Sequence, residues 1–154
     1  MGDFTIRVGH AEFEPGAEIA ALSGNPAAGA IASFVGLVRN YGDDAHVTAL
    51  ELEHYPGMTE AELGRIVGEA RERWPLTAAT IIHRVGYLPL GEPIVLVVVA
   101  SGHRRDAFAA CEFLMDYLKT RAPFWKKEYY RDGTSRWVDA KDSDDDAAAR
   151  WMAQ

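Results

Sequence analysis

The residues that could do chemistry gather in the stretch DYLKTRAPFWKKEYY, positions 116–130. Lys119 follows Met115 and Cys111 by four and eight residues, so the three share one helix face. Burial and neighbouring cations lower the pKa of a lysine, and a partly neutral amine can act as a base or nucleophile. A proline at position 123 ends the helix, so Lys126 can return beside Lys119. Alternatively, Lys119 extends into solvent while the neighbouring Phe124 and Trp125 close the core.

Two further cationic sites could join this one. In SGHRRDAF (101–108), a buried strand ends and a helix begins at His103 and Arg104. Free N–H groups at a helix start and the forked guanidinium both suit phosphate or carboxylate. A solvent-exposed basic turn that pairs with nearby acids explains the same pattern, and the local sequence leaves both open. Arg39 ends a β-rich run just before a turn and is a weaker third candidate.

The overall charge excludes some classes of function. The chain has 154 residues, and we expect one domain spanning 1–154. Its formal net charge of -7 argues against general nucleic-acid binding, which needs a basic footprint. Residues 103–127 nonetheless hold six Lys and Arg against three acids, so a local basic pocket is possible.

Several common sites are not expected. Cys111 is the one cysteine and lies among apolar neighbours, so we interpret it as inert packing, and we expect no metal site. His54 and His83 lie in strand patterns and are interpreted as structural. There is no GxGxxG or GxxxxGK[ST] motif, so no nucleotide cofactor is predicted. No apolar run is long enough for a membrane span and the N-terminus reads as mature, so we expect a cytoplasmic protein.

The elements that must position these residues follow from periodicity. Helices are predicted over 57–75, with Thr59 as its cap, and over 103–121. Strands are predicted at 4–8, 30–40, 47–55 and 77–88, and 94–101 reads as a central strand covered on both faces. We expect 30–40 and 47–55 to form a hairpin through a turn at YGDDAH, and 126–139 to form another around Asp132-Gly133. This mixed order predicts an α+β domain.

Taken in order, six motifs resemble those of a known family. They are FVGLVRN, LELEHYPGMTE, RWPL, IIHRVGYLPLGE, SGHRRDAF and MDYLKTRAPFWKKE. Together they are similar to the large, catalytic subunit of molybdopterin synthase, the MoaE family. The resemblance runs from about residue 4 to residue 151, and HRxxAF followed by DxLKxxxPxWKKE is its most specific part.

The resemblance implies a fold, a reaction and partners. The fold is an α/β hammerhead with an additional antiparallel β subdomain. The enzyme is a sulfurtransferase of molybdenum cofactor biosynthesis that converts cyclic pyranopterin monophosphate (precursor Z) into the molybdopterin dithiolene. Each sulfur arrives as a thiocarboxylate on the C-terminal Gly-Gly of a small ubiquitin-like carrier subunit, MoaD. Two large subunits form a homodimer within a heterotetramer, with no cofactor, nucleic acid or membrane involved.

The resemblance also assigns site residues. Lys119 and Lys126 are implied as catalytic. His103 and Arg104 are implied to reach the pocket of the neighbouring protomer. The implied substrate-binding residues are Arg39, His103, Arg104, Lys127, Glu128, Leu37, Val38, Phe34 and Met115. Some relatives carry a lysine at the position of Leu37, so a contact made by that side chain would be missing here.

Two other functions fit parts of the pattern. A non-catalytic module that binds a phosphorylated metabolite would use the same cations, but would not need Lys119 and Lys126 together. A single-stranded RNA binder would stack bases on four aromatic residues, but the net charge of -7 disfavours it. Those aromatic residues are Phe124, Trp125, Tyr129 and Tyr130.

Overall fold

The structure is a computed structural model that describes residues 3–40, 46–138 and 142–153, and it contains two four-stranded sheets. The first sheet has the order β1-β4-β6-β2 and contains β1 (Phe4–Gly9), β4 (Leu76–Arg84), β6 (Pro93–Ser101) and β2 (Ala30–Leu37). The second has the order β5-β3-β7-β8 and contains β5 (Gly86–Pro89), β3 (Val47–His54), β7 (Phe124–Tyr130) and β8 (Ser135–Val138). The helices are α1 (Pro15–Ala21), α2 (Met58–Arg73), α3 (Arg104–Arg121) and α4 (Asp142–Ala149), followed by the 3₁₀ turn η1 (Arg150–Ala153).

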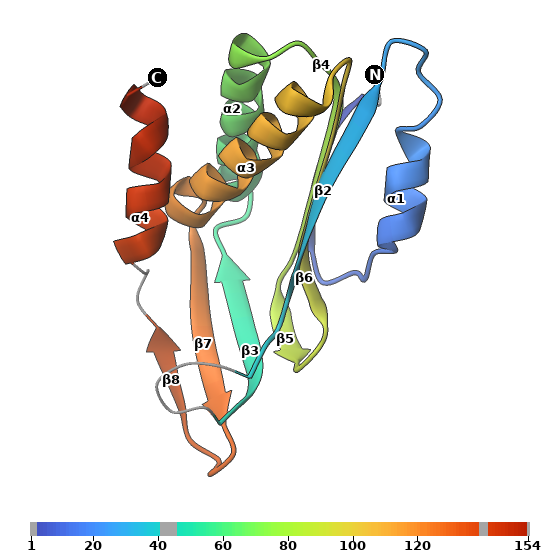
Figure 1. The fold of residues 1–154 in the computed structure, drawn as a ribbon. Coiled ribbons are helices and arrows are strands. Elements are labelled where there is room, and N and C mark those ends of the chain that lie inside the picture. Colours follow the sequence, from blue (N-terminus) through green and yellow to red (C-terminus); the bar gives the residue numbers. More distant parts are fainter. Residues whose placement is uncertain (1–2, 41–45, 139–141, 154) are drawn as a thin grey trace.

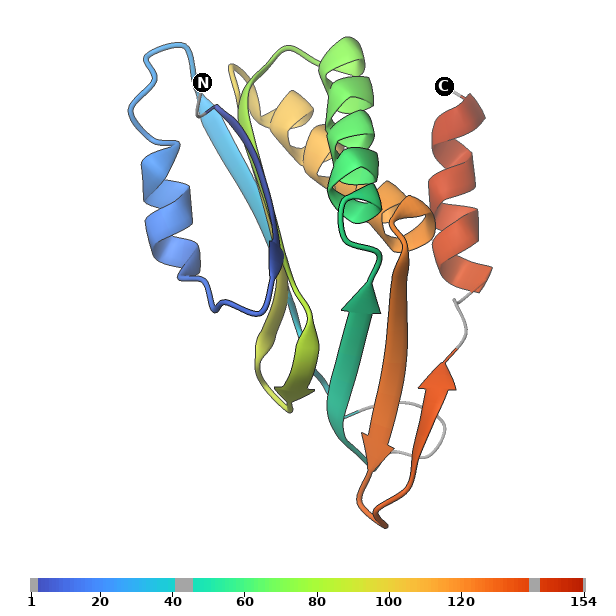
Figure 2. The same cartoon turned by 180° about the vertical axis from the view of Figure 1, so that it is seen from behind.

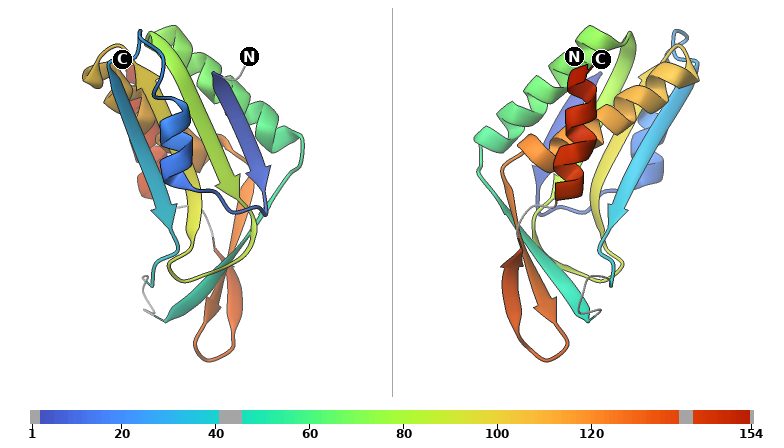
Figure 3. Two further views of the ribbon diagram at one scale, coloured as in Figure 1. Left: turned by 90° about the vertical axis from the view of Figure 1, so that its right-hand side faces the viewer. Right: turned by 60° about the vertical axis from the view of Figure 1, so that its left-hand side comes forward.

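Helices cover both faces of the first sheet. Helices α2 and α3 lie on one face and the short α1 lies on the other (Figure 1; Figure 3, left). The central strand β6 alternates its side chains accordingly, since Val97 packs toward α2 and α3 while Leu96 and Val98 pack toward α1. The prediction of a central strand buried on both faces is therefore confirmed, and so is the α+β class.

The second sheet extends away from the helices, below α2 and α3 (Figure 2). Helix α3 leads into it directly, because only Ala122 and Pro123 separate the helix from β7. Proline disfavours helical backbone in the residue before it, so the helix ends there as predicted. Strands β7 and β8 form the predicted hairpin. The assignment of residues 1–154 to one domain stays a prediction.

The predicted hairpin between 30–40 and 47–55 is wrong. Strand β2 pairs with β6 in the first sheet, whereas β3 pairs with β5 and β7 in the second. The two segments are neighbours in sequence, but each pairs with a strand that is distant from the other segment. Strand β2 lies along β6, which is rich in β-branched residues, and β3 lies between β5 and β7. The predicted turn at YGDDAH lies, except for His46, outside the described residues.

The predicted strand 77–88 is in fact two strands. It bends at Val85 and Gly86, where the chain passes from the first sheet into the second. Gly86 has φ +90°, and a Cβ there would lie 2.7 Å from Nδ1 of His10. A residue with a Cβ would be strained at this φ and would displace the His10 ring, so glycine is strongly favoured at this crossing. Val85 and Leu88 then join a small core cluster with Leu50 from β3.

Two helix details complete the frame. Thr59 is not the cap of α2, because the helix begins one residue before it; the Thr59 hydroxyl donates instead to the Tyr55 carbonyl at 2.9 Å. At the other end of the chain, Trp151 of η1 is buried against Trp74 and Phe113. In the described part of the chain, no helix combines the length and apolar character needed to cross a membrane.

Candidate active site

A cavity of about 430 Å³ lies where the two sheets and the end of α3 meet. This volume is within the range of small-molecule sites. Its walls come from β2 and the residues after it, from β3, β4, β6 and β7, and from α3. They comprise Phe34, Val35, Gly36, Leu37, Arg39, Leu50, Leu52, His83, Ile94, Val95, Lys119 and Lys126.

Three cations from three distant segments line this cavity. Arg39 follows β2, Lys119 lies on the last turn of α3, and Lys126 lies on β7. Arg39 and Lys119 are exposed, and Lys126 is half-buried. Arginine and lysine only donate hydrogen bonds, so three such groups on a mostly apolar wall suit an anionic ligand. The structure thus brings together the two lysines and the arginine that the sequence singled out.

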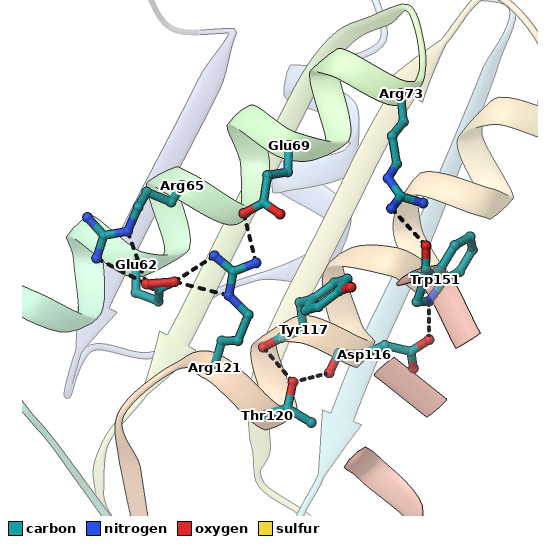
Figure 4. Close-up of polar contacts among 9 residues, drawn as sticks. All are labelled: Glu62, Arg65, Glu69, Arg73, Asp116, Tyr117, Thr120, Arg121 and Trp151. Carbon is teal, nitrogen blue, oxygen red and sulfur yellow. Dashed lines mark hydrogen bonds and ion pairs between the residues drawn. The ribbon is translucent and has the colours of Figure 1, made fainter. Parts of the chain in front are cut away.

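The end of α3 that carries Lys119 is tied to α2. Arg121 pairs with Glu62 at 2.8 Å and with Glu69 at 2.7 Å (Figure 4). Burial of Glu62 favours a higher pKa, but hydrogen bonds from Arg121 and Arg65 outweigh it and leave the pKa lowered. These bonds hold the last turn of the helix, and therefore the backbone of Lys119, in a fixed place beside the cavity.

His83 also lines the cavity, although its place in a strand pattern predicted a structural role. The ring is 5% exposed and stacks on Phe124 with centroids 3.8 Å apart. Its Nδ1 lies 2.8 Å from the carbonyl oxygen of Arg84, so Nδ1 carries the hydrogen. Burial, with the charge of Lys119 as a smaller contribution, lowers the pKa of His83 to about 3. Strand alternation through 79, 81 and 83 was the signal that could have placed it on the inner face.

The predicted apolar residues are distributed over three places: the cavity, a neighbouring groove and a small core cluster. Phe34 lines this cavity and also a neighbouring groove of about 720 Å³, and Met115 lines only the groove. Leu37 lines the cavity with a half-exposed side chain. Val38 is buried in the small core beside it, and its N–H donates to the Glu92 carbonyl at 3.0 Å. The backbone near Leu37 is thus fixed, whichever side chain stands there.

Lys127 and Glu128 differ from Lys126 in their surroundings. Residues alternate along β7, so Lys127 faces the opposite side of the sheet, with its ammonium 5.6 Å from the Trp137 ring centroid. Glu128 shares the face of Lys126 but is buried, and it accepts a hydrogen bond from the Tyr130 hydroxyl at 2.8 Å. Neither lines the cavity, so their substrate-binding roles stay predictions.

His103 and Arg104 lie at the opposite end of α3 from Lys119. Both are exposed, and fifteen residues at 1.5 Å each separate Arg104 from Lys119 by about 22 Å. One chain therefore does not bring them to the cavity. The expectation that they act in the neighbouring protomer stays a prediction.

Three other candidate features are a reactive cysteine, a base-stacking surface and a metal site. Cys111 is buried, and burial raises its pKa to about 11, so its reactive thiolate form is disfavoured at neutral pH. The four aromatic residues 124, 125, 129 and 130 do not form one stacking surface, because they alternate between the two faces of β7. Within the described ranges, no three His, Cys, Asp or Glu side chains are grouped so that they could hold a metal ion.

Known proteins resemble this chain over nearly its whole length. A family model described as "MoaE protein" matches residues 8–121. A molybdopterin synthase catalytic subunit from Ralstonia nicotianae is 60% identical over 148 residues, which is 96% of this chain and 84% of that protein. One from Escherichia coli is 52% identical over 151 residues, covering 98% and 100%. The solved structure of a molybdopterin biosynthesis MoaE protein from Burkholderia ambifaria is 54% identical, with a TM-score of 0.81 and coverage of 97% and 99%.

These matches span nearly the whole chain, at identities far above the level at which only a fold is shared. They include the segments that carry Arg39 and Lys119. The chain belongs to the MoaE family, whose named relatives are molybdopterin synthase catalytic subunits.

Proposed function

We propose that this protein is the catalytic subunit of a molybdopterin synthase. It transfers sulfur from the C-terminal thiocarboxylate of a small ubiquitin-like carrier subunit to cyclic pyranopterin monophosphate, and so forms the molybdopterin dithiolene. The observation that carries the proposal is the convergence of Arg39, Lys119 and Lys126 on one cavity. The substrate has a cyclic phosphate and the sulfur donor is a thiocarboxylate, so both reactants bring an anion to these cations.

The three cations take different parts in the reaction. Lys119 orients and activates the incoming thiocarboxylate, because it lies on the helix end that Arg121 fixes. Lys126 faces it from β7 and exchanges a proton with the substrate or holds an anionic intermediate. Arg39 binds the phosphate. General acid–base help of this kind is worth roughly 10²–10⁴-fold in rate.

A carrier subunit and a second copy of the chain complete the assembly. The partner called MoaD delivers its Gly-Gly tail to the cavity, and two large subunits form a dimer. A solved structure from Helicobacter pylori is titled a protein–protein complex of subunits 1 and 2 of molybdopterin-converting factor; at 21% identity and a TM-score of 0.65, its likeness to this chain concerns the fold alone. We place the reaction in the cytoplasm, where the substrate and the carrier would meet it.

His103 and Arg104 then serve the neighbouring protomer. Strand β2 is at an edge of its sheet, and Phe34 and Leu37 are exposed along it. A two-fold contact through this edge would run antiparallel, so the Ala30 end of one β2 would lie against the Leu37 end of the other. Ala30 pairs with Ser101, two residues before His103. The eight residues of β2 span about 25 Å. This length is close to the distance that separates Arg104 from Lys119 within one chain, so the contact could bring Arg104 of one protomer to the cavity of the other.

The decisive experiment is Lys119→Ala assayed with precursor Z and thiocarboxylated carrier. We expect product formation to fall at least 100-fold while the circular dichroism spectrum is unchanged. Full activity in this variant would refute the assignment. Turnover by the wild type also separates this function from a module that only binds a phosphorylated metabolite.

Arg39→Ala tests the phosphate site separately. The arginine is exposed and its contact is to a non-reacting group, so we expect a raised KM for precursor Z with little change in kcat. An unchanged KM would contradict the phosphate role. The dimer is tested by mixing Lys119→Ala with Arg104→Ala, since each mixed dimer would regain one complete site and part of the activity.

A further inference from the structure

The polar groups of the cavity wall are almost all of one kind. Arg39, Lys119 and Lys126 can donate hydrogen bonds but have no atom that accepts one. Among the described side chains that line this cavity, His83 is the only one that can accept. A ligand that contacts the cations alone would make no use of this acceptor.

The His83 ring is held in one orientation. Its Nδ1–H donates to the Arg84 carbonyl at 2.8 Å, and its face stacks on Phe124 at an interplanar angle of 18°. A neutral imidazole with hydrogen on Nδ1 has its lone pair on Nε2. Nε2 is therefore the ring nitrogen that can accept a hydrogen bond, and the stacking and the bond to Arg84 keep it in one place.

The surroundings of His83 keep the ring neutral. Burial is the largest cause of its lowered pKa of about 3, and the Lys119 and His54 side chains lower it further, although the bond to Arg84 raises it. The ring also borders a second, smaller cavity, which is lined by the charged residues Arg7, Glu12 and Glu60. At neutral pH the ring is thus an acceptor, and it is too weak a base to carry a proton away from the substrate.

We propose that Nε2 of His83 accepts a hydrogen bond from an N–H or O–H group of the substrate, so that the cavity selects anions that also carry a donor. The inference rests on the proposed function, since the proposed substrate carries N–H groups on its pterin ring system as well as a cyclic phosphate. An inorganic phosphate or a simple carboxylate satisfies the cations and nothing else. Such ligands gain nothing from the imidazole, whereas a ligand that also carries a donor gains one hydrogen bond to it.

Three variants test this role. His83→Phe removes the acceptor but keeps a planar ring against Phe124. His83→Gln keeps an acceptor within reach of the Nε2 position. His54→Gln is the matched control, because His54 also lies near Phe124, at 6.2 Å, but does not line the cavity.

The measurement is calorimetric binding of two probes, precursor Z and inorganic phosphate, to the full chain at pH 7. We expect His83→Phe to bind precursor Z about tenfold more weakly, and phosphate as the wild type does. His83→Gln should recover most of the lost affinity, and His54→Gln should bind both probes normally. The affinity ratio of wild type to His83→Phe should stay constant between pH 5 and pH 8.

Three other binding results would overturn the inference. If the wild type and His83→Phe bind precursor Z equally well, His83 does not accept a hydrogen bond from it. Equal loss for both probes, or a Gln variant as weak as the Phe variant, shows that His83 only supports the wall. Because binding needs no sulfur transfer, normal binding without turnover would contradict the proposed function and leave this inference standing.

Discussion

Replacing Trp151 by alanine should destabilise the protein by about 4 kcal/mol. The indole is 5% exposed and packs edge-on against Trp74 and Phe113, with centroids 5.7 and 5.5 Å away. Truncating a buried tryptophan costs about 3–5 kcal/mol through lost burial and the cavity left behind. Its Nε1–H also donates to Asp116 at 2.7 Å, and that bond is lost too (Figure 4).

Trp151→Phe separates the two contributions. Phenylalanine keeps most of the apolar contact but cannot donate to Asp116, so we expect a loss of about 1–2 kcal/mol. Asp116 still pairs with Arg150 at 3.1 Å, which limits the cost of the missing donor. The alanine variant should therefore lose at least twice as much stability as the phenylalanine variant.

The assay is urea unfolding at one fixed protein concentration, followed by circular dichroism. Neither variant touches Arg39, Lys119 or Lys126, so both should keep their turnover at temperatures where they are folded. A loss below about 1 kcal/mol for Trp151→Ala, or equal losses for both variants, would refute the view that this C-terminal indole closes the core.

Three more outcomes follow from the structure. Lys126→Ala should lower turnover at least tenfold more than Lys127→Ala, measured with precursor Z, because only Lys126 faces the cavity; the reverse order would contradict this. Cys111→Ser should stay active and the native thiol should react slowly with iodoacetamide at pH 7, since its pKa is raised; a dead, folded variant would refute it. Glu62→Gln should lower the free energy of unfolding at pH 7. The cost should shrink as the pH falls below about 4.5, because a lowered pKa stabilises the fold fully above the unfolded value of 4.5 and that stabilisation is lost as the pH falls through the folded pKa; a pH-independent cost would count against the pairing with Arg121.

Much of the fold could be predicted because it is encoded locally. Helix α3 shows its period and its stop at Pro123, and β6 shows an unbroken apolar run. The partners of β2 and β3 could not be predicted in this way. Strand pairing depends on apolar surface far away in sequence, and proximity along the chain favoured the wrong hairpin.

In the site, too, the residues within one short stretch could be predicted, and those that depend on distant contacts could not. Lys119 and Lys126 were found because a helix and a strand in one short stretch carry both. His83 was missed because its role comes from what stacks on it and what it faces, and neither is visible in the strand pattern. Arg104 and Lys119 lie at opposite ends of α3, and the cavity lies at the Lys119 end only, which the sequence pattern does not show.

The crossing at Gly86 has a consequence for how this enzyme can change. Leu37 and Arg39 belong to the first sheet and its following segment, whereas Lys126 belongs to the second. The chain passes from the first sheet to the second at Gly86, whose positive φ a residue with a Cβ rarely adopts. Substitutions near this joint, remote from every reacting group, can therefore widen or narrow the opening and retune ligand size while the chemistry stays the same.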